Sequence, residues 1–227
     1  MKHIRKQLGI ALLALGFAWS SHAASEEKLG QKAQDAANIL HDAVSVPETS
    51  IPDSLLERAT CVVTIPNVIR AAIGFGGRFG TGLASCRVAG GWSQPSFVKI
   101  KGGSWGAQFG AQTVDLILVF INPDAVQILS KATFTAGVDA SITAGPLGRD
   151  AEAGVDYKLD SAIYSYSKAQ GLFAGIALQG SAMTVDQKDN AKMYNMNVDA
   201  NTLLTTSGDR APATLKPYVD GLKMYAH

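Results

Sequence analysis

The sequence predicts a single α+β domain, in which a strongly bent antiparallel β-sheet, barrel- or sandwich-like, is flanked by N- and C-terminal helices. Three observations predict it. Residues 25–44 place apolar side chains at three- and four-residue steps, the chain from Cys61 is rich in β-branched residues and glycine, and helical character returns after Asp186. Because no internal repeat and no interior linker interrupts this order, we expect one domain over residues 24–227.

The first 23 residues have the pattern of a secretory signal peptide. Three basic residues precede an apolar stretch at 8–19, and small residues follow in Ser21-His22-Ala23. The apolar stretch is too short to span a membrane as a helix. We therefore expect residues 1–23 to be removed, and the remaining chain to be exported to the periplasm or cell envelope, or secreted. The residue directly after the predicted cleavage is Ala24 and not a cysteine, so a lipid-anchored N-terminus is not expected.

The charge of the exported chain argues against nucleic acid as a partner. Three of the 20 Lys and Arg residues lie in the signal peptide and none of the 19 Asp and Glu residues does, which leaves 17 basic against 19 acidic residues, or −2. A nucleic-acid binder needs a basic excess or a basic stripe. The content of 47% hydrophobic and 17% charged residues is that of a folded chain.

Cys61 and Cys86 are the two cysteines of the chain. In an exported protein, two cysteines favour one disulfide. It would close a loop of roughly 25 residues and stabilise the fold by about 3 kcal/mol in the chain-entropy model. The alternative is two buried thiols.

Helices are expected at four places, each with its own signal. Residues 25–44 form an amphipathic helix, and Pro52–Arg58 a short one with proline suited to its first position. Asn122-Pro123-Asp124 ends a strand and begins a helix over Ala125–Lys131. The last helical segment lies near Tyr218–Ala226.

Strands are expected between these helices. The expected strands share β-branched or alternating apolar residues. They are residues 61–66, a glycine-rich stretch to Val88, 97–103, 113–121, and strands within 133–160 around the turn 145–150. A hairpin is expected over 162–185, with its turn at 169–171.

The stretch GFGGRFGTG, residues 74–82, does not match a nucleotide-binding loop. In G-x-G-x-x-G the third glycine would fall at Phe79 or Ser85, and Gly-Lys-Ser/Thr occurs nowhere in the chain. The stretch also leads into a strand-like run, not into a helix that could hold phosphate. Its glycines, with those of residues 102–110, instead indicate bulges, tight bends or close backbone approach in a strongly bent sheet.

Few residues offer catalytic chemistry. His41 is the one histidine between the signal peptide and the last residue, and we expect it on a helix surface. Asp115, inside an apolar strand, is either a catalytic acid or a structural or outward-facing one, and we favour the structural role. We therefore expect a non-enzymatic protein without a metal or a cofactor.

Several motifs in one order then resemble a known family: IPDSLLERA at 51–59, WSQPSF at 92–97, GGSWGAQFGAQTVDLILV at 102–119, GPLGR at 145–149 and IYSYSKAQGLFAGIALQGS at 163–181. The chain resembles the SYLF, or Ysc-like, domain family over Ile51–Leu204. It departs from the family pattern at Tyr194, which is followed by asparagine where the family usually has glycine. The resemblance implies binding of phosphoinositides or other anionic phospholipids, without catalysis. Actin binding accompanies this in some eukaryotic members but is not expected of an exported chain.

A lipid headgroup needs basic side chains beside an apolar surface. Lys99 and Lys101 are two apart and should share a strand face with Phe97. The headgroup candidates are Arg70, Arg78, Lys99, Lys101 and Arg149, and the membrane-contact candidates are Phe75, Phe79 and Phe97. Residues 25–44 carry several acids on their polar face, so this helix is expected to pack on the sheet. The alternative function is a cell-envelope interaction module without lipid specificity.

Overall fold

The computed structural model describes residues 25–45, 50–148, 162–169 and 171–226, with the backbone alone at 72–75 and 104–111. The predicted signal peptide and the last two residues of the predicted turn at 145–150 lie outside these ranges. The helices are an N-terminal helix (25–45), α2 (Asp53–Glu57), α3 (Ala125–Ser130), α5 (Gln187–Tyr194), α6 (Ala200–Thr205) and α7 (Lys216–Tyr225). The strands are β1 (Cys61–Val88), β2 (Gly91–Trp92), β3 (Ser96–Phe120), β4 (Phe134–Thr135), β5 (Ile142–Ala144), β6 (Ile163–Ala169), β7 (Leu172–Gly175) and β8 (Ala182–Val185).

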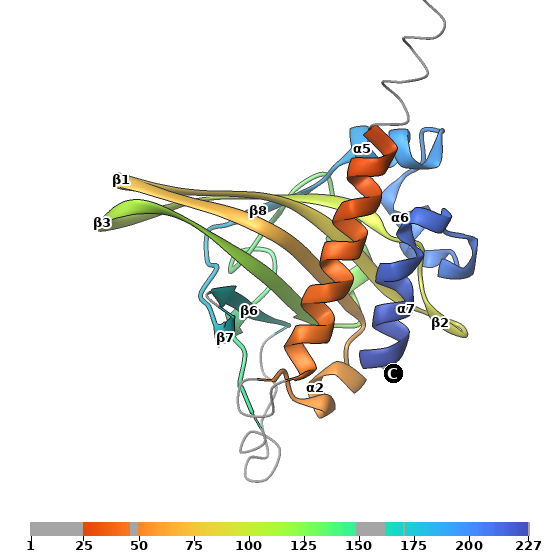
Figure 1. The fold of residues 1–227 in the computed structure, drawn as a ribbon, viewed down its shortest axis with the longest axis horizontal. Helices are drawn as coiled ribbons and strands as arrows, with labels where there is room; N and C mark the ends of the chain where they lie inside the picture. Colours follow the sequence, from red (N-terminus) through yellow and green to blue (C-terminus); the bar gives the residue numbers. More distant parts are fainter. Residues whose placement is uncertain (1–24, 46–49, 149–161, 170, 227) are drawn as a thin grey trace, which may run out of the picture.

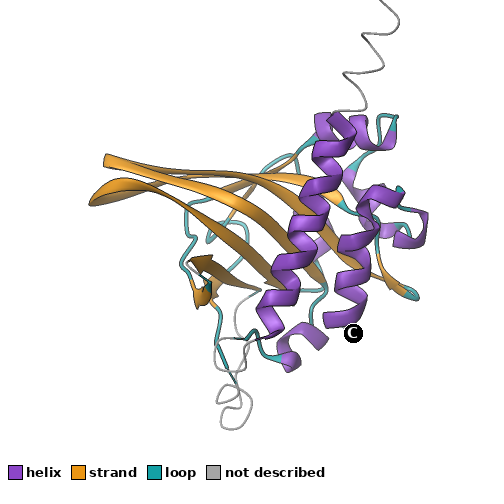
Figure 2. Cartoon of the chain, in the orientation of Figure 1, coloured by secondary structure: helices purple, strands orange, loops and turns teal. Residues whose placement is uncertain are grey.

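The strands form one strongly curled sheet, as the sequence predicted. Its main order is β2-β1-β3-β6-β5, with β7 beside β6 and with β8 between β3 and β4. The neighbours are antiparallel except for β5 and β6, which run parallel. The N-terminal helix and α7 lie side by side against one side of the sheet, while the paired β1 and β3 extend beyond them to a free end (Figures 1 and 2).

The strands β1 and β3 are longer than the sequence suggested. The expected pieces 61–66 and the glycine-rich stretch are one continuous strand of 28 residues, and 97–103 and 113–121 join into β3, of 25 residues. The two strands pair antiparallel from Cys61 opposite Phe120 to Ala84 opposite Ser96. Irregularities interrupt the register between Ile65 and Val68 and again between Ile73 and Phe75. Glycine therefore lets the paired strands continue through a bend, where the sequence alone suggested separate strands.

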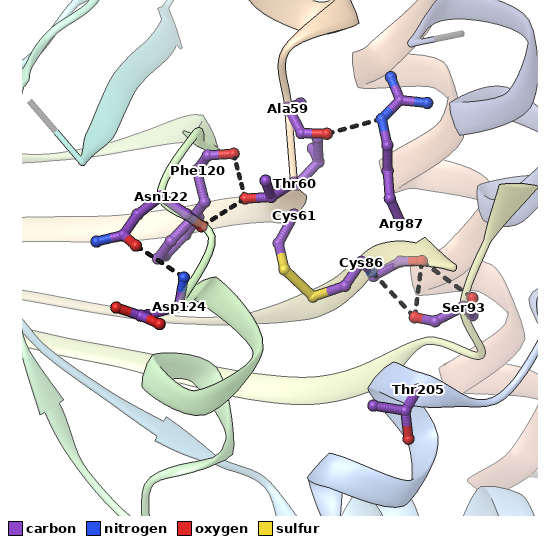
Figure 3. Close-up of a disulfide and its surroundings, with 12 residues drawn as sticks. Ala59, Thr60, Cys61, Cys86, Arg87, Ser93, Phe120, Asn122, Asp124 and Thr205 are labelled. Atoms are coloured by element: carbon purple, nitrogen blue, oxygen red, sulfur yellow. Dashed lines mark hydrogen bonds between the residues drawn. A yellow bond between two sulfur atoms is a disulfide. The ribbon is translucent and has the colours of Figure 1, made fainter. Parts of the chain in front are cut away.

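The two halves of β1 fold back on each other. Cys61 and Cys86, near its two ends, form the predicted disulfide with their Cα atoms 3.9 Å apart (Figure 3). Further along, a Cβ atom added at Gly82 would lie 2.2 Å from the carbonyl oxygen of Thr64, and one added at Gly80 would lie 2.8 Å from Val68 Cγ2. The prediction of close backbone approach is thus confirmed at Gly80 and Gly82, because no side chain fits between the two halves.

Buried residues join the helices to this folded strand. The face under the N-terminal helix and α7 carries one apolar cluster, and the opposite side under α3 and α6 carries a second. Tyr218 of α7 is completely buried, and its hydroxyl donates to the carbonyl oxygen of Val62 at 3.1 Å while lying 3.3 Å from that of Leu83. One phenol therefore connects both halves of β1.

Burial raises the pKa of the Tyr218 phenol, which makes stability depend on alkaline pH. In the unfolded chain tyrosine ionises near pH 10, whereas in the folded protein it keeps its proton, so the free energy of unfolding should fall above about pH 10 by about 1.4 kcal/mol per pH unit from this group. Urea unfolding at pH 9 and pH 11 tests this. Tyr218→Phe should lose less stability between the two pH values than the wild type, and equal losses would contradict the assignment.

Three predicted elements differ in detail. Pro52 precedes α2 as its N-cap residue and is not its first helical residue. The hairpin over 162–185 is confirmed only for β6 and β7, which meet beside Gly171 at φ +87°. The prediction is wrong for its second half, because the chain leaves β6 after Gly175 and β8 pairs with β3 and β4 instead. The final helix begins at Lys216, so that Pro217 lies in its first turn.

Candidate functional site

A groove lies between the N-terminal helix and the folded part of β1. It has a volume of about 240 Å³, and its lining residues are Lys28, Gln31, Lys32 and Asp35 from the helix and Pro66, Asn67, Ile69, Phe79, Gly80 and Thr81 from β1. The groove exists because β1 folds back, which brings residues 66–69 and residues 79–81 of the same strand to one cavity beside the helix. The helix packs on the sheet through buried Leu29, Ala33, Ala36 and Leu40, as its sequence pattern predicted.

Two large apolar side chains are exposed at this groove. Ile69 is 53% and Phe79 45% exposed, although most large apolar residues of the sheet are buried. Phe79 is paired across the ribbon with Lys101, which is also exposed, and paired residues project from the same side of a sheet. Exposed apolar surface rimmed by charge is typical of an interaction site. The groove and the adjoining ribbon therefore form the candidate functional site.

The lysines around the groove differ in how they are paired. Lys32 donates to the hydroxyl of Thr81, and burial lowers its pKa against the opposing effect of Asp189 and Asp186. Lys99 forms an ion pair with buried Asp186 at 2.8 Å. Lys101 and Lys28 are exposed. Lys28 at the groove and Lys101 on the adjoining ribbon are therefore available to an anionic surface, while Lys99 is already neutralised by a structural carboxylate.

Arg70 and Arg78, two of the predicted headgroup residues, are not among the residues that line the groove. Arg78 projects from the same side of β1 as Gly80, two residues away, and the stem of its side chain lies against Gly102 of β3. Its guanidinium reaches the carbonyl oxygen of Ala177 at 3.5 Å. Burial, and next the positive charge of Arg70, lower the pKa of Arg78. The structure therefore brings Arg70 and Arg78 together, at the bend and not at the groove.

The membrane-contact prediction is wrong for Phe97. Its side chain is 1% exposed and belongs to the core under the helices, and its backbone N–H donates to buried Asn190 at 2.8 Å. Phe97, Lys99 and Lys101 follow one another at two-residue steps along β3, as expected for one strand face. Along these steps the residues change from buried to exposed, so this face passes from the core to solvent. The side chain of Phe75 and the whole of Arg149 lie outside the described residues.

Sequence reasoning missed Lys28, Lys32 and Ile69. Alternation along β1 could have indicated Ile69, because it lies between residues that face inward. No local signal indicates that the two lysines meet β1, since this depends on how the helix packs.

The two residues considered for catalysis have structural roles. The carboxylate of Asp115 accepts from the backbone N–H of Asn67 at 3.0 Å. Asn67 has the left-handed backbone φ of 53° at the irregularity in β1, so Asp115 satisfies a donor that the sheet leaves free. His41 lies exposed on the N-terminal helix, with Nδ1 2.8 Å from the hydroxyl of Tyr225. These observations favour the structural reading of both residues.

Within the described ranges, no three histidine, cysteine, aspartate or glutamate side chains gather into a group that could hold a metal ion. No helix in that same part of the chain is long and apolar enough to cross a membrane.

A groove of mixed polar and apolar lining, with two exposed apolar side chains and lysines at its rim, is typical of an interaction surface. A family model described as "Ysc84: Las17-binding protein actin regulator" matches residues 101–225, more than half of the chain. The chain therefore belongs to the Ysc84, or SYLF-domain, family, as its motifs predicted.

Relatives in fungi and vertebrates support the same family membership. An SH3 domain-containing protein of Schizosaccharomyces pombe is 40% identical over 172 residues, which cover 74% of this chain and 39% of that protein. LAS seventeen-binding protein 3 of Saccharomyces cerevisiae is 36% identical over 159 residues, covering 68% and 34%. SH3 domain-containing YSC84-like protein 1 of Xenopus laevis is 32% identical over 176 residues, covering 74% and 52%. The chain thus spans between about a third and a half of these relatives.

Proposed function

We propose that the protein is an exported, non-catalytic domain that binds anionic phospholipid surfaces through the groove and the free end of the β1–β3 ribbon. The observation that carries the proposal is the pair of half-exposed apolar side chains, Ile69 and Phe79, beside the exposed lysines 28 and 101. Apolar groups that enter the interface, next to cations that meet the headgroups, are the two requirements of peripheral membrane binding.

Export is supported by two independent features. The first residues have the basic, apolar and small pattern of a signal peptide. The Cys61–Cys86 disulfide suits an oxidising compartment. An exported domain would meet the periplasmic or outer surface of a membrane. For this reason we do not include actin among its partners, although the family description names actin regulation.

Co-sedimentation of the processed chain, residues 24–227, with lipid vesicles tests the proposal. We expect binding to vesicles that contain phosphatidylglycerol, weaker binding at physiological than at low salt, and little binding to neutral vesicles. The double substitution Ile69→Ser and Phe79→Ser should weaken binding at least tenfold, because each side chain loses apolar area that would enter the interface. Met224→Ser is the matched control, since Met224 is 65% exposed but lies on α7, away from the groove.

Binding to neither vesicle would reject lipid recognition and favour the alternative, an envelope domain that binds a protein partner. Equal losses in the groove and Met224 variants would reject the groove as the membrane contact. Co-sedimentation of the processed chain with actin filaments is a further experiment. Specific binding of the chain to the filaments would contradict our exclusion of actin.

A further inference from the structure

Arg70 and Arg78 form a like-charged pair where β1 folds back. Val68 contacts Gly80 across the fold, with a Cβ atom at Gly80 only 2.8 Å from Val68 Cγ2. Two residues further toward the bend on each half, and on the same sides of the strand, come Arg70 and Arg78. The contacts between the two halves of β1 run from the disulfide, through Gly82 and Gly80, toward the bend, and Arg70 and Arg78 come next in this direction. The fold of the strand therefore places the two arginines opposite each other near the bend, and the positive charge of Arg70 contributes to lowering the pKa of Arg78.

This pair has no counter-charge in the described part of the chain. The ion pairs found there join Lys99, Lys168, Lys192 and Lys223 to aspartates, and none includes Arg70 or Arg78. Arg78 has only the weak contact to the carbonyl oxygen of Ala177, and both side chains are partly buried. Two partly desolvated cations that repel each other are costly unless an anion joins them.

A buried hydroxyl adjoins the same place. Ser181 is 2% exposed, and its Oγ has no hydrogen-bond partner in the structure. A Cβ atom placed on Gly102 would lie 2.7 Å from this oxygen and 3.2 Å from Arg78 Cγ, so the hydroxyl and the arginine stem both border the glycine. Native proteins rarely leave such a group unsatisfied. The hydroxyl is thus a donor without an acceptor, and it borders the same glycine as Arg78, whose charge has no anionic partner among the described residues.

We propose that Arg70, Arg78 and Ser181 form a phosphate-binding site that prefers a monoester dianion. Guanidinium groups bind phosphate oxygens with paired hydrogen bonds, and the serine hydroxyl would donate to a third oxygen. A monoester phosphate carries a charge between about −1.5 and −2 at neutral pH, which matches two arginines better than the single charge of a diester. The phosphate could belong to a lipid headgroup, which rests on the proposed function, or to a soluble phosphate.

Thermal unfolding in inorganic phosphate tests the site without any membrane. At constant ionic strength, we expect a saturable rise in the melting temperature of the processed chain relative to chloride. Arg70→Gln and Arg78→Gln should abolish the rise, and they should not lower the melting temperature without phosphate, because they remove repulsion. Arg210→Gln, at an exposed arginine of the 3₁₀ turn Gly208–Arg210, should behave like the wild type.

Ser181→Ala provides a second variant that keeps both charges. Because it deletes an unsatisfied hydroxyl, it should fold at least as well as the wild type, while its affinity for phosphate should fall about tenfold. An unchanged affinity would remove Ser181 from the site. No saturable phosphate effect in the wild type, or the same effect in all the arginine variants, would overturn the proposal.

Vesicles then distinguish the two sources of phosphate. Vesicles with phosphatidic acid, a monoester, are compared with vesicles of phosphatidylglycerol, a diester, at equal surface charge. Preference for phosphatidic acid that is lost in Arg70→Gln supports a headgroup ligand. Phosphate stabilisation without this preference supports a soluble ligand, and binding to phosphatidylglycerol then tests the proposed membrane function separately.

Discussion

Replacing Gly82 by alanine is expected to destabilise the domain by about 3 kcal/mol, a large part of the stability of a typical domain. The new methyl group would lie 2.2 Å from the carbonyl oxygen of Thr64 and 2.6 Å from the Cα atom of Ile65. Both obstacles belong to the backbone of the other half of β1, so relief requires the two halves to separate. Separation would also stretch the hydrogen bond from Tyr218 to Val62.

Urea unfolding of the processed chain measures this loss, and Gly77→Ala is its matched control. Gly77 lies in the same glycine-rich stretch, but a Cβ atom there would come no closer than 4.0 Å to its nearest neighbour, the carbonyl oxygen of Gly102. Alanine at Gly77 should change the free energy of unfolding by less than about 0.5 kcal/mol. Similar losses at both glycines would show that general chain flexibility, and not contact across the fold, explains the glycines.

The contrast between these two glycines shows which part of the fold the sequence can predict. Glycine spacing excluded a phosphate loop and indicated a strongly bent sheet, because these are local properties of a segment. The pairing of Gly82 with Thr64 depends on where the strand bends, and that is determined by contacts far apart in sequence. The same reason explains why one 28-residue strand was expected as two segments.

The candidate site was predictable to a similar extent. Arg70 and Arg78 were indicated because they flank the glycine-rich stretch, and Phe79 because it lies within it. The prediction of membrane contact was wrong for Phe97. Alternation along a strand shows which residues share a face, but not where along the strand the helices cover that face. Lys32 meets Thr81 only through the packing of the N-terminal helix. The apolar stripe of this helix was visible in the sequence, but its position on the sheet was not.

Removing the disulfide is the second large expected effect. Substituting alanine for Cys61 and Cys86 together should lower the free energy of unfolding by about 3 kcal/mol, since the bond closes a loop whose ends are 25 residues apart. Urea unfolding of this double variant and of the reduced wild type measures it. The two should agree within about 1 kcal/mol, and a loss below about 1 kcal/mol would show that the buried contacts hold the strand ends together without the bond.

The buried position of the disulfide also affects how fast it can be reduced. Both cysteines are fully buried, so a soluble thiol cannot reach the sulfur atoms unless the folded strand opens. Reduction of the native protein should therefore be slow, and low concentrations of urea that leave it folded should accelerate reduction. Gly82→Ala should accelerate it as well, because the same separation of the two halves exposes the bond, whereas Gly77→Ala should not. Equal reduction rates in the wild type and Gly82→Ala would mean that the disulfide opens independently of the contact at Gly82, and the two would then not act as one structural unit.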